Sequence, residues 1–414
     1  MSFNKINKAN FSKLQKSFCS NNCKGNVYYN YSQYVKQSLR NQFIQYSLFM
    51  LSSGILFLND LDEEEDNKVN TQDSKITYIE PNPEIIKKYI YDLNKIIKEK
   101  GKYSNEAAQQ VHMIGYYYIN TNNFQKAIDY LKEVYKIKNK ISPEAYKEIV
   151  EVSNDIGVCY TNLLDFQKAL EYYDSSLKLC IDKLGYRNGV TGITYSNIGM
   201  IYSQQNKLDK AEEYQNKALI ILKSCYNEDH KSVGDIYTAI GNIYYKRQNL
   251  AKCLEYFMLT YNLFNKTYGE NNFNSLEAIH NVGVVLRDLK DFDKSIEFFE
   301  KELQIMKKQF GESSQGCAVS SRHLANCLTL KGDFAEATKH LENAINILSQ
   351  IEPQSNETAV CYIELSNAYN QLKKKDLAAD ALIKAKRIYI NIHSKDDLHV
   401  KRIDTILDRI LKDN

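Results

Sequence analysis

One short sequence pattern recurs along this chain at a nearly constant interval of 42 residues. A small residue opens each of seven copies, the last after 41 residues: Gly115, Gly157, Gly199, Gly241, Gly283, Ala325 and Ser366. Nine residues later stand Phe124, Phe166, Leu208, Leu250, Phe292, Phe334 and, as an exception, Lys375. Twelve residues later stand Ala127, Ala169, Ala211, Cys253, Ser295, Ala337 and Ala378. A fixed period of about 20–50 residues indicates a stacked array of repeats.

The residue types within one copy indicate two antiparallel helices. Small residues on both helices allow a close approach, and the larger apolar residue between them fills the remaining space. Three residues after the small residue, on the same helical face, the copies carry Tyr118, Tyr160, Tyr202, Tyr244, Leu286 and Leu328. Short polar pairs such as Asn122-Asn123, Gln248-Asn249 and Gly332-Asp333 separate the two helical stretches. Each copy therefore predicts a helical hairpin.

The pattern of small residue, tyrosine, phenylalanine and alanine resembles the tetratricopeptide repeat in the copies beginning near Tyr116, Val158, Met200 and Asn242. That family has a usual period of about 34 residues, and the longer period here resembles the subtype of kinesin light chains. Turns similar to the Leu-Gly turn of that subtype occur at Leu184-Gly185, Tyr268-Gly269-Glu270-Asn271, Phe310-Gly311-Glu312 and Tyr226-Asn227-Glu228-Asp229-His230. The resemblance implies an all-α, right-handed solenoid of about seven helical hairpins over residues 83–395.

Both ends of this array predict a covering helix. Pro83 suits an early helical position, and the apolar stripe that follows it continues to Gly101, as expected for half a repeat. At the other end, residues 396–414 carry apolar residues on one side and charged residues on the other. The last hairpin of a solenoid needs such a cover, so we expect a C-terminal capping helix over 396–414.

The region before the repeats consists of three segments that differ in charge and hydrophobicity. Residues 1–59 hold seven Lys or Arg and no Asp or Glu, so residues 1–42 resemble a mitochondrial presequence, with a disordered polar tail as the alternative. Residues 43–58 carry no charge and predict a membrane anchor over 43–59; the alternative is an apolar helix packed on the repeats. Residues 60–82 are polar and acidic and predict a flexible tether. With the basic side in the matrix, the repeats would face the intermembrane space.

The sequence contains no pattern typical of an enzyme. It lacks a Walker loop, a dinucleotide fingerprint, an HExxH motif and a nucleophile elbow. Three of its nine cysteines, Cys159, Cys253 and Cys327, fall at packed repeat positions. His280 and His323 occupy nearly the same place in consecutive repeats, and we expect them to come close without carboxylate or thiolate company. We therefore expect no catalytic or metal site, cofactor or small-molecule substrate, and the mildly acidic array predicts no nucleic-acid partner.

The most promising residues lie on the first helix of each hairpin, which lines the concave face in this family. The positions expected to face a partner hold Asn154, Asn197, Asn242, Lys246, Asn281, Arg287, Arg322, Asn326, Asn367 and Asn370. Asparagine can donate to and accept from a peptide backbone at once, whereas a lysine or arginine could meet an acidic side chain or a terminal carboxylate. We expect Asn281, Arg287 and Arg322 to face solvent.

These features predict a non-enzymatic scaffold that binds a partner peptide or helix in the concave groove. The leader, anchor, tether and repeats together are similar in organisation to a mitochondrial inner-membrane tetratricopeptide protein of respiratory complex III biogenesis. The alternative is a soluble, cytoplasmic adaptor for motor cargo or cilia, similar to kinesin light chain. Kinesin light chains carry a heptad coiled coil before the repeats, and residues 1–80 show no such heptads.

Overall fold

The computed structural model of the chain describes residues 83–269, 271–272, 275–392, 395 and 398–412. The predicted leader (1–42), membrane anchor (43–59) and tether (60–82) lie outside these residues. Regular structure in the described part consists of sixteen α-helices and one π-helix, with no strand. No helix in this part of the chain is both long enough and apolar enough to cross a membrane.

The chain divides into two compact units, Met1–Gly185 and Tyr186–Asn414. The described elements of the first unit are α3 (Pro83–Lys100), α4 (Asn105–Asn120), α5 (Phe124–Ile141), α6 (Tyr146–Asn162), α7 (Phe166–Leu179) and the π-helix η1 (Cys180–Leu184). The second unit contains α8 (Gly189–Gln204), α9 (Leu208–Cys225), α10 (Lys231–Lys246), α11 (Leu250–Tyr268), α12 (Leu276–Asp288), α13 (Phe292–Phe310), α14 (Gln315–Lys331), α15 (Phe334–Ile351), α16 (Asn356–Gln371), α17 (Lys375–Ile392) and α18 (Leu398–Lys412).

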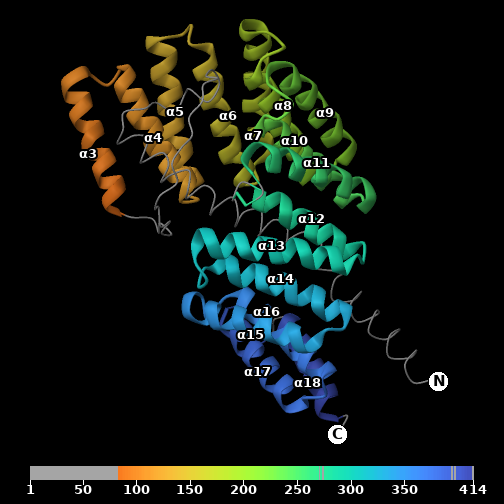
Figure 1. The fold of residues 1–414 in the computed structure, drawn as a ribbon. Coiled ribbons are helices and arrows are strands. Elements are labelled where there is room, and N and C mark those ends of the chain that lie inside the picture. Colours follow the sequence, from red (N-terminus) through yellow and green to blue (C-terminus); the bar gives the residue numbers. More distant parts are fainter. Residues whose placement is uncertain (1–82, 270, 273–274, 393–394, 396–397, 413–414) are drawn as a thin grey trace. The chain divides into compact units, whose positions relative to one another are not determined.

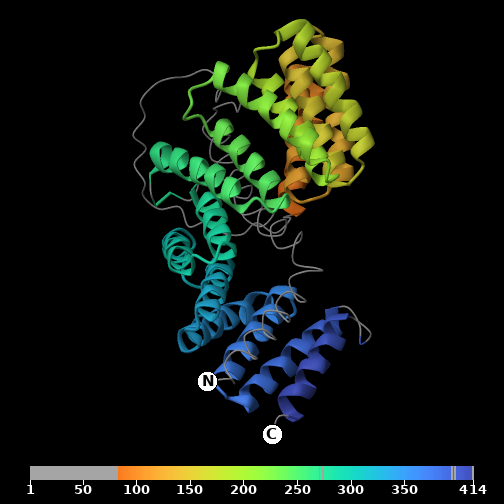
Figure 2. The same cartoon turned by 90° about the vertical axis from the view of Figure 1, so that its right-hand side faces the viewer.

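Consecutive helices pair into seven hairpins, as predicted. The pairs are α4 with α5 and α6 with α7 in the first unit, and α8 with α9, α10 with α11, α12 with α13, α14 with α15 and α16 with α17 in the second. The same pairing can be followed within each unit in Figure 2. Helix α3 packs on α4, and α18 packs on α17 through a cluster that includes Val400, Ile403, Leu407 and Ile410. Each unit is therefore a stack of helical hairpins with a single helix at one end.

The recurring glycine marks the closest approach between the two helices of a hairpin. A Cβ atom added to Gly157 would lie 2.5 Å from Cε1 of Tyr173, and one added to Gly241 would lie 2.5 Å from Cε1 of Phe257. The filling residue stands sixteen positions after the glycine, and Tyr173 and Phe257 are among the largest fully buried side chains. The packing role predicted for the glycine is confirmed, but the prediction missed the residue that covers it.

The turn inside each hairpin uses one residue with a left-handed backbone. Asn122, Leu164, Asn206, Gln248, Lys290 and Lys373 have φ between 56° and 68° at this place, and Gly332 has φ 104°. The following residue caps the second helix: the side chains of Asn123, Asp165 and Asn249 accept hydrogen bonds from the backbone N–H of Lys126, Lys168 and Lys252. These caps satisfy amides that the first helical turn leaves without partners.

Three turns between hairpins require glycine more strictly than the turns inside them do. Gly185, Gly269 and Gly311 have φ of 87°, 89° and 86° and ψ of 157°, 160° and 159°. A side chain is strained in this combination of angles, so glycine is the residue that permits it. The three glycines that resemble the Leu-Gly turn of kinesin light chains therefore share one backbone conformation.

Candidate functional site

Two of the three charged residues predicted to contact a partner, Arg287 and Arg322, lie on the first helices α12 and α14 of the second unit. The next first helix along the chain is α16, and all three helices are labelled in Figure 1. Arg322 and Asn326 lie on α14, and Glu357 and Glu364 lie seven residues apart on α16. The repeat places α16 beside α14 as the first helix of the next hairpin, so residues about 42 positions apart in sequence meet. We refer to these four residues as the Arg322 cluster.

Ion pairs and hydrogen bonds join the members of the Arg322 cluster. Nε of Arg322 donates to Oε1 of Glu357, and Nη1 donates to Oε1 of Glu364 at 3.3 Å. Nδ2 of Asn326 donates to the same Glu364 oxygen at 3.3 Å. Burial alone would lower the pKa of Arg322, but Glu357 and Glu364 together raise it above its ordinary value. Arg322 is therefore held as a charged group between two carboxylates.

A fully buried polar network lies next to this cluster. Nδ1 of His280 lies 3.1 Å from Oε2 of Glu302, and Oγ of Ser320 donates to Oε1 of Glu302 at 3.0 Å. The rings of His280 and His323 lie 4.8 Å apart, as expected. The expectation that the two histidines lack a carboxylate neighbour is wrong. Glu302 lies on the second helix α13. Comparison of residues on first helices alone does not reveal this neighbour.

His323 connects the buried network to the Arg322 cluster. Its Nε2 lies 3.2 Å from Nη2 of Arg322, and its ring stacks on Phe299 at 5.4 Å. Burial, followed by the charges of Arg322, His280 and Arg287, holds the pKa of His323 well below its usual value. His323 is therefore neutral at physiological pH. Among the described residues, no three His, Cys, Asp or Glu side chains gather as metal ligands would.

Two residues expected to face solvent are buried, so that expectation is wrong for them. Asn281 is 6% exposed and Arg322 is 8% exposed. Arg287 is partly exposed and donates to Oδ1 of Asp288 at 2.9 Å, while Oη of Tyr245 donates to Oδ2 of the same carboxylate at 2.6 Å. The guanidinium of Arg322 is thus engaged by Glu357 and Glu364 of the next hairpin, and the side chain is buried there.

The remaining predicted residues differ in how far they reach solvent. Lys246 is exposed and its Nζ donates to the carbonyl oxygen of Ser203 at 2.7 Å. Asn154 is buried on α6 of the first unit. The partly or fully exposed asparagines, all in the second unit, are Asn197, Asn242, Asn326, Asn367 and Asn370. In the described part of the chain, no hydrogen bond engages the side-chain amides of Asn197, Asn242, Asn367 or Asn370.

The first unit carries a polar group that the sequence reasoning missed. Oη of Tyr116 donates to Oδ2 of Asp155 at 2.9 Å, and Nε2 of His112 lies 3.2 Å from the same oxygen. The rings of His112 and Tyr116 stack at 4.5 Å. His112, Tyr116 and Asp155 occupy repeat positions that were selected in other copies, so the same spacing rule, applied to every residue type, would have found them.

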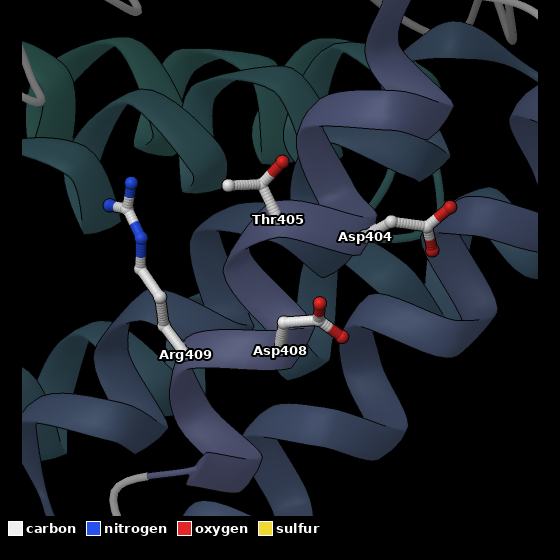
Figure 3. Close-up of a pocket in the computed structure, with 4 residues that line it drawn as sticks. All are labelled: Asp404, Thr405, Asp408 and Arg409. Atoms are coloured by element: carbon white, nitrogen blue, oxygen red, sulfur yellow. The ribbon is translucent and has the colours of Figure 1, made fainter.

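Two hollows in the surface lie away from these residues. One, of about 340 Å³, is lined by Asp404, Thr405, Asp408 and Arg409 (Figure 3), all on the single helix α18. The other, of about 280 Å³, lies among α3, α4 and α5 and is lined mostly by apolar side chains, with Lys102 and Glu133 paired at 2.7 Å. A hollow built from one face of one helix lacks the converging groups of a binding pocket, so we place no site on α18.

Comparison with known proteins identifies the fold. Profiles described as tetratricopeptide repeat match residues 148–224, 232–308 and 316–391, and a second such profile matches residues 111–141. Sequence comparison with curated proteins finds no match.

The chain is similar to solved structures at low sequence identity, and the first two below share its fold. The apo form of RapI is 16% identical, with 80% of this chain and 85% of that chain covered and a TM-score of 0.58. The apo quorum sensor NprR from B. thuringiensis is 15% identical, with 73% and 82% covered and a TM-score of 0.54. BtubC from P. vanneervenii is 18% identical, with 54% and 92% covered and a TM-score of 0.47. Because the repeat profiles match more than half of the sequence, the chain belongs to the tetratricopeptide repeat family.

Proposed function

We propose that this chain is a non-enzymatic protein-interaction scaffold that holds an extended partner segment on the first helices of its second unit. The observation that carries the proposal is the set of asparagine amides without hydrogen bonds in the described residues, Asn197, Asn242, Asn367 and Asn370. Asparagine is an indifferent residue inside a helix, so its repeated use there points to a role outside the helix. An amide can donate to and accept from the backbone of a bound peptide.

Replacement of three of these amides tests the proposal. Changing Asn242, Asn367 and Asn370 together to alanine should leave the free energy of unfolding within about 1 kcal/mol, since surface substitutions are nearly neutral. A matched control changes three exposed asparagines on second helices, Asn216, Asn343 and Asn346, to alanine.

Peptides that bind the full chain would be selected from a displayed library of random twelve-residue sequences. Fluorescence polarisation would then give the affinity of the selected peptides for each variant. The first variant should bind at least about tenfold more weakly, which corresponds to roughly 1.4 kcal/mol, and the control should bind normally. Failure to select any peptide, or equal binding by both variants, would contradict the proposal.

We further propose that residues 1–42 direct the chain to mitochondria and that residues 43–59 anchor it in the inner membrane, with the repeats in the intermembrane space. The acid-free basic leader and the uncharged run that follows support this placement. Cell fractionation should find the protein in mitochondria and resistant to carbonate extraction. A soluble cytosolic protein with an intact N-terminus would instead support the adaptor role similar to kinesin light chain.

A further inference from the structure

Each of the three nitrogens of the Arg322 guanidinium already lies beside a partner within the chain. Its Nε binds Glu357, its Nη1 binds Glu364, and its Nη2 lies 3.2 Å from Nε2 of His323. A carboxylate from a partner would either stand beside Glu357 and Glu364 as a third negative charge or displace one of them. The displaced group would then remain partly buried without a positive charge beside it, which is costly. Binding of an acidic partner group by Arg322, as the sequence predicted, is therefore unfavourable.

The Arg322 cluster carries more negative than positive charge and can accept a further cation. It contains two carboxylates and one guanidinium, and the neighbouring His323 is neutral. Within the described residues, Oε2 of Glu364 is buried and has no hydrogen-bond partner. Burial raises the pKa of the Glu364 carboxyl and the charge of Glu357 raises it further, whereas the charges of Arg322 and Arg287 lower it only in part. A carboxylate oxygen that has lost water without gaining a donor is the natural partner of an ammonium or guanidinium group.

Both glutamate side chains are partly open to solvent, although Oε2 of Glu364 itself is buried. The side chain of Glu357 is 30% exposed and that of Glu364 is 22% exposed, whereas the side chain of Arg322 is only 10% exposed. Asn367 follows Glu364 by one helical turn, on the side of α16 that carries the amides of the proposed groove. At the rise of about 1.5 Å per residue, Glu364 lies about 4.5 Å and Glu357 about 15 Å along the helix from Asn367. An extended segment that binds Asn367 and continues along α16 would therefore pass Glu364 and then Glu357.

We propose that Glu357 and Glu364 receive a lysine or arginine side chain of the bound segment, so that the partner of this scaffold carries a basic residue. The inference rests on the proposed function and names the partner class. A lysine ammonium has three donors and an arginine guanidinium has five, enough to engage the exposed edge of Glu357 and, after a small outward turn of the Glu364 carboxylate, its Oε2 as well. Arg322 then acts as a positioning residue that holds the two carboxylates in place.

Peptides selected by the full chain test this inference. They should carry Lys or Arg at one shared position, and replacement of that residue by Gln should weaken binding to the unmodified chain by about tenfold or more. The Glu364→Gln chain keeps the shape and the Oε1 acceptor of the side chain, and it should bind the basic and the Gln peptide nearly equally. Glu297→Gln, an exposed change on α13, should retain the full discrimination.

The outcomes separate the two proposals. If peptides are selected but share no basic residue, or share an acidic one, the inference is overturned and the scaffold function stands. If Glu364→Gln discriminates between the two peptides as the unmodified chain does, the inference is also overturned. If no peptide is selected, the scaffold function fails. Should Glu364→Gln melt at a clearly lower temperature, Glu357→Gln provides the same comparison from the other carboxylate, with the same expected loss of discrimination.

Discussion

A methyl group added to Gly157 tests how the helices of a hairpin approach one another. The new Cβ would lie 2.5 Å from Cε1 and 2.7 Å from Cζ of Tyr173, a ring that is 1% exposed and has no free space to enter. Alanine favours a helix over glycine by about 1 kcal/mol, whereas overpacking costs roughly 1–3 kcal/mol. Because a rigid ring makes this contact, we expect Gly157→Ala to lower the free energy of unfolding by about 1–2 kcal/mol.

Gly283→Ala is the matched control at the same repeat position. Its Cβ would lie 3.1 Å from Cε1 of Phe299, so a ring shift of a few tenths of an ångström accommodates it. The gain in helix propensity and the cost of this shift should nearly cancel, leaving the free energy of unfolding within about 0.5 kcal/mol of the unmodified chain. Urea unfolding followed by circular dichroism measures both variants.

A second substitution identifies the cause of the loss. The sixth hairpin carries Ala325 and Leu341 at the corresponding positions, both fully buried. In a Tyr173→Leu background, Gly157→Ala should therefore become stabilising by up to about 1 kcal/mol, a coupling of about 1–3 kcal/mol between the two sites. If Gly157→Ala costs the same with tyrosine and with leucine at position 173, the steric explanation is wrong.

Three further changes have expected outcomes in the second unit. Arg322→Gln should lower the free energy of unfolding by about 1–3 kcal/mol, because Glu357 and Glu364 lose their counter-ion; a loss below about 0.5 kcal/mol in urea unfolding would contradict the ion-pair assignment. The folded state depresses the pKa of His323 below 6.5 and so binds fewer protons than the unfolded state. Stability should therefore be constant above about pH 6.5 and fall below it by up to about 1.4 kcal/mol per pH unit, and His323→Gln should flatten this dependence in unfolding curves measured from pH 7 to 5. Gly311→Ala should cost about 1–3 kcal/mol, since its φ of 86° and ψ of 159° strain any side chain; an unchanged melting temperature would argue against that turn.

The periodic pattern alone determined the number of hairpins, the place of the turn inside each and the role of the recurring glycine. Each of these is a local property: a hairpin's two helices are joined by a short turn, and residues within 16 positions of Gly157 decide how closely those helices pack. The tyrosine at position 173 could have been recognised by the same spacing, because Leu131, Phe257 and Phe299 stand at the equivalent positions.

Only the tertiary structure decided which polar residues face solvent. Arg322 was expected to be exposed, and its burial depends on Glu357 and Glu364, which lie 35 and 42 residues further along the chain. The carboxylate beside His280 comes from the second helix of the same hairpin, at Glu302. A charged side chain on a first helix has the same sequence pattern whether it points into solvent or toward the next hairpin. The difference arises because burial is stabilising only when an opposite charge and the correct donors arrive from another element, and their geometry exists only after the hairpins have stacked.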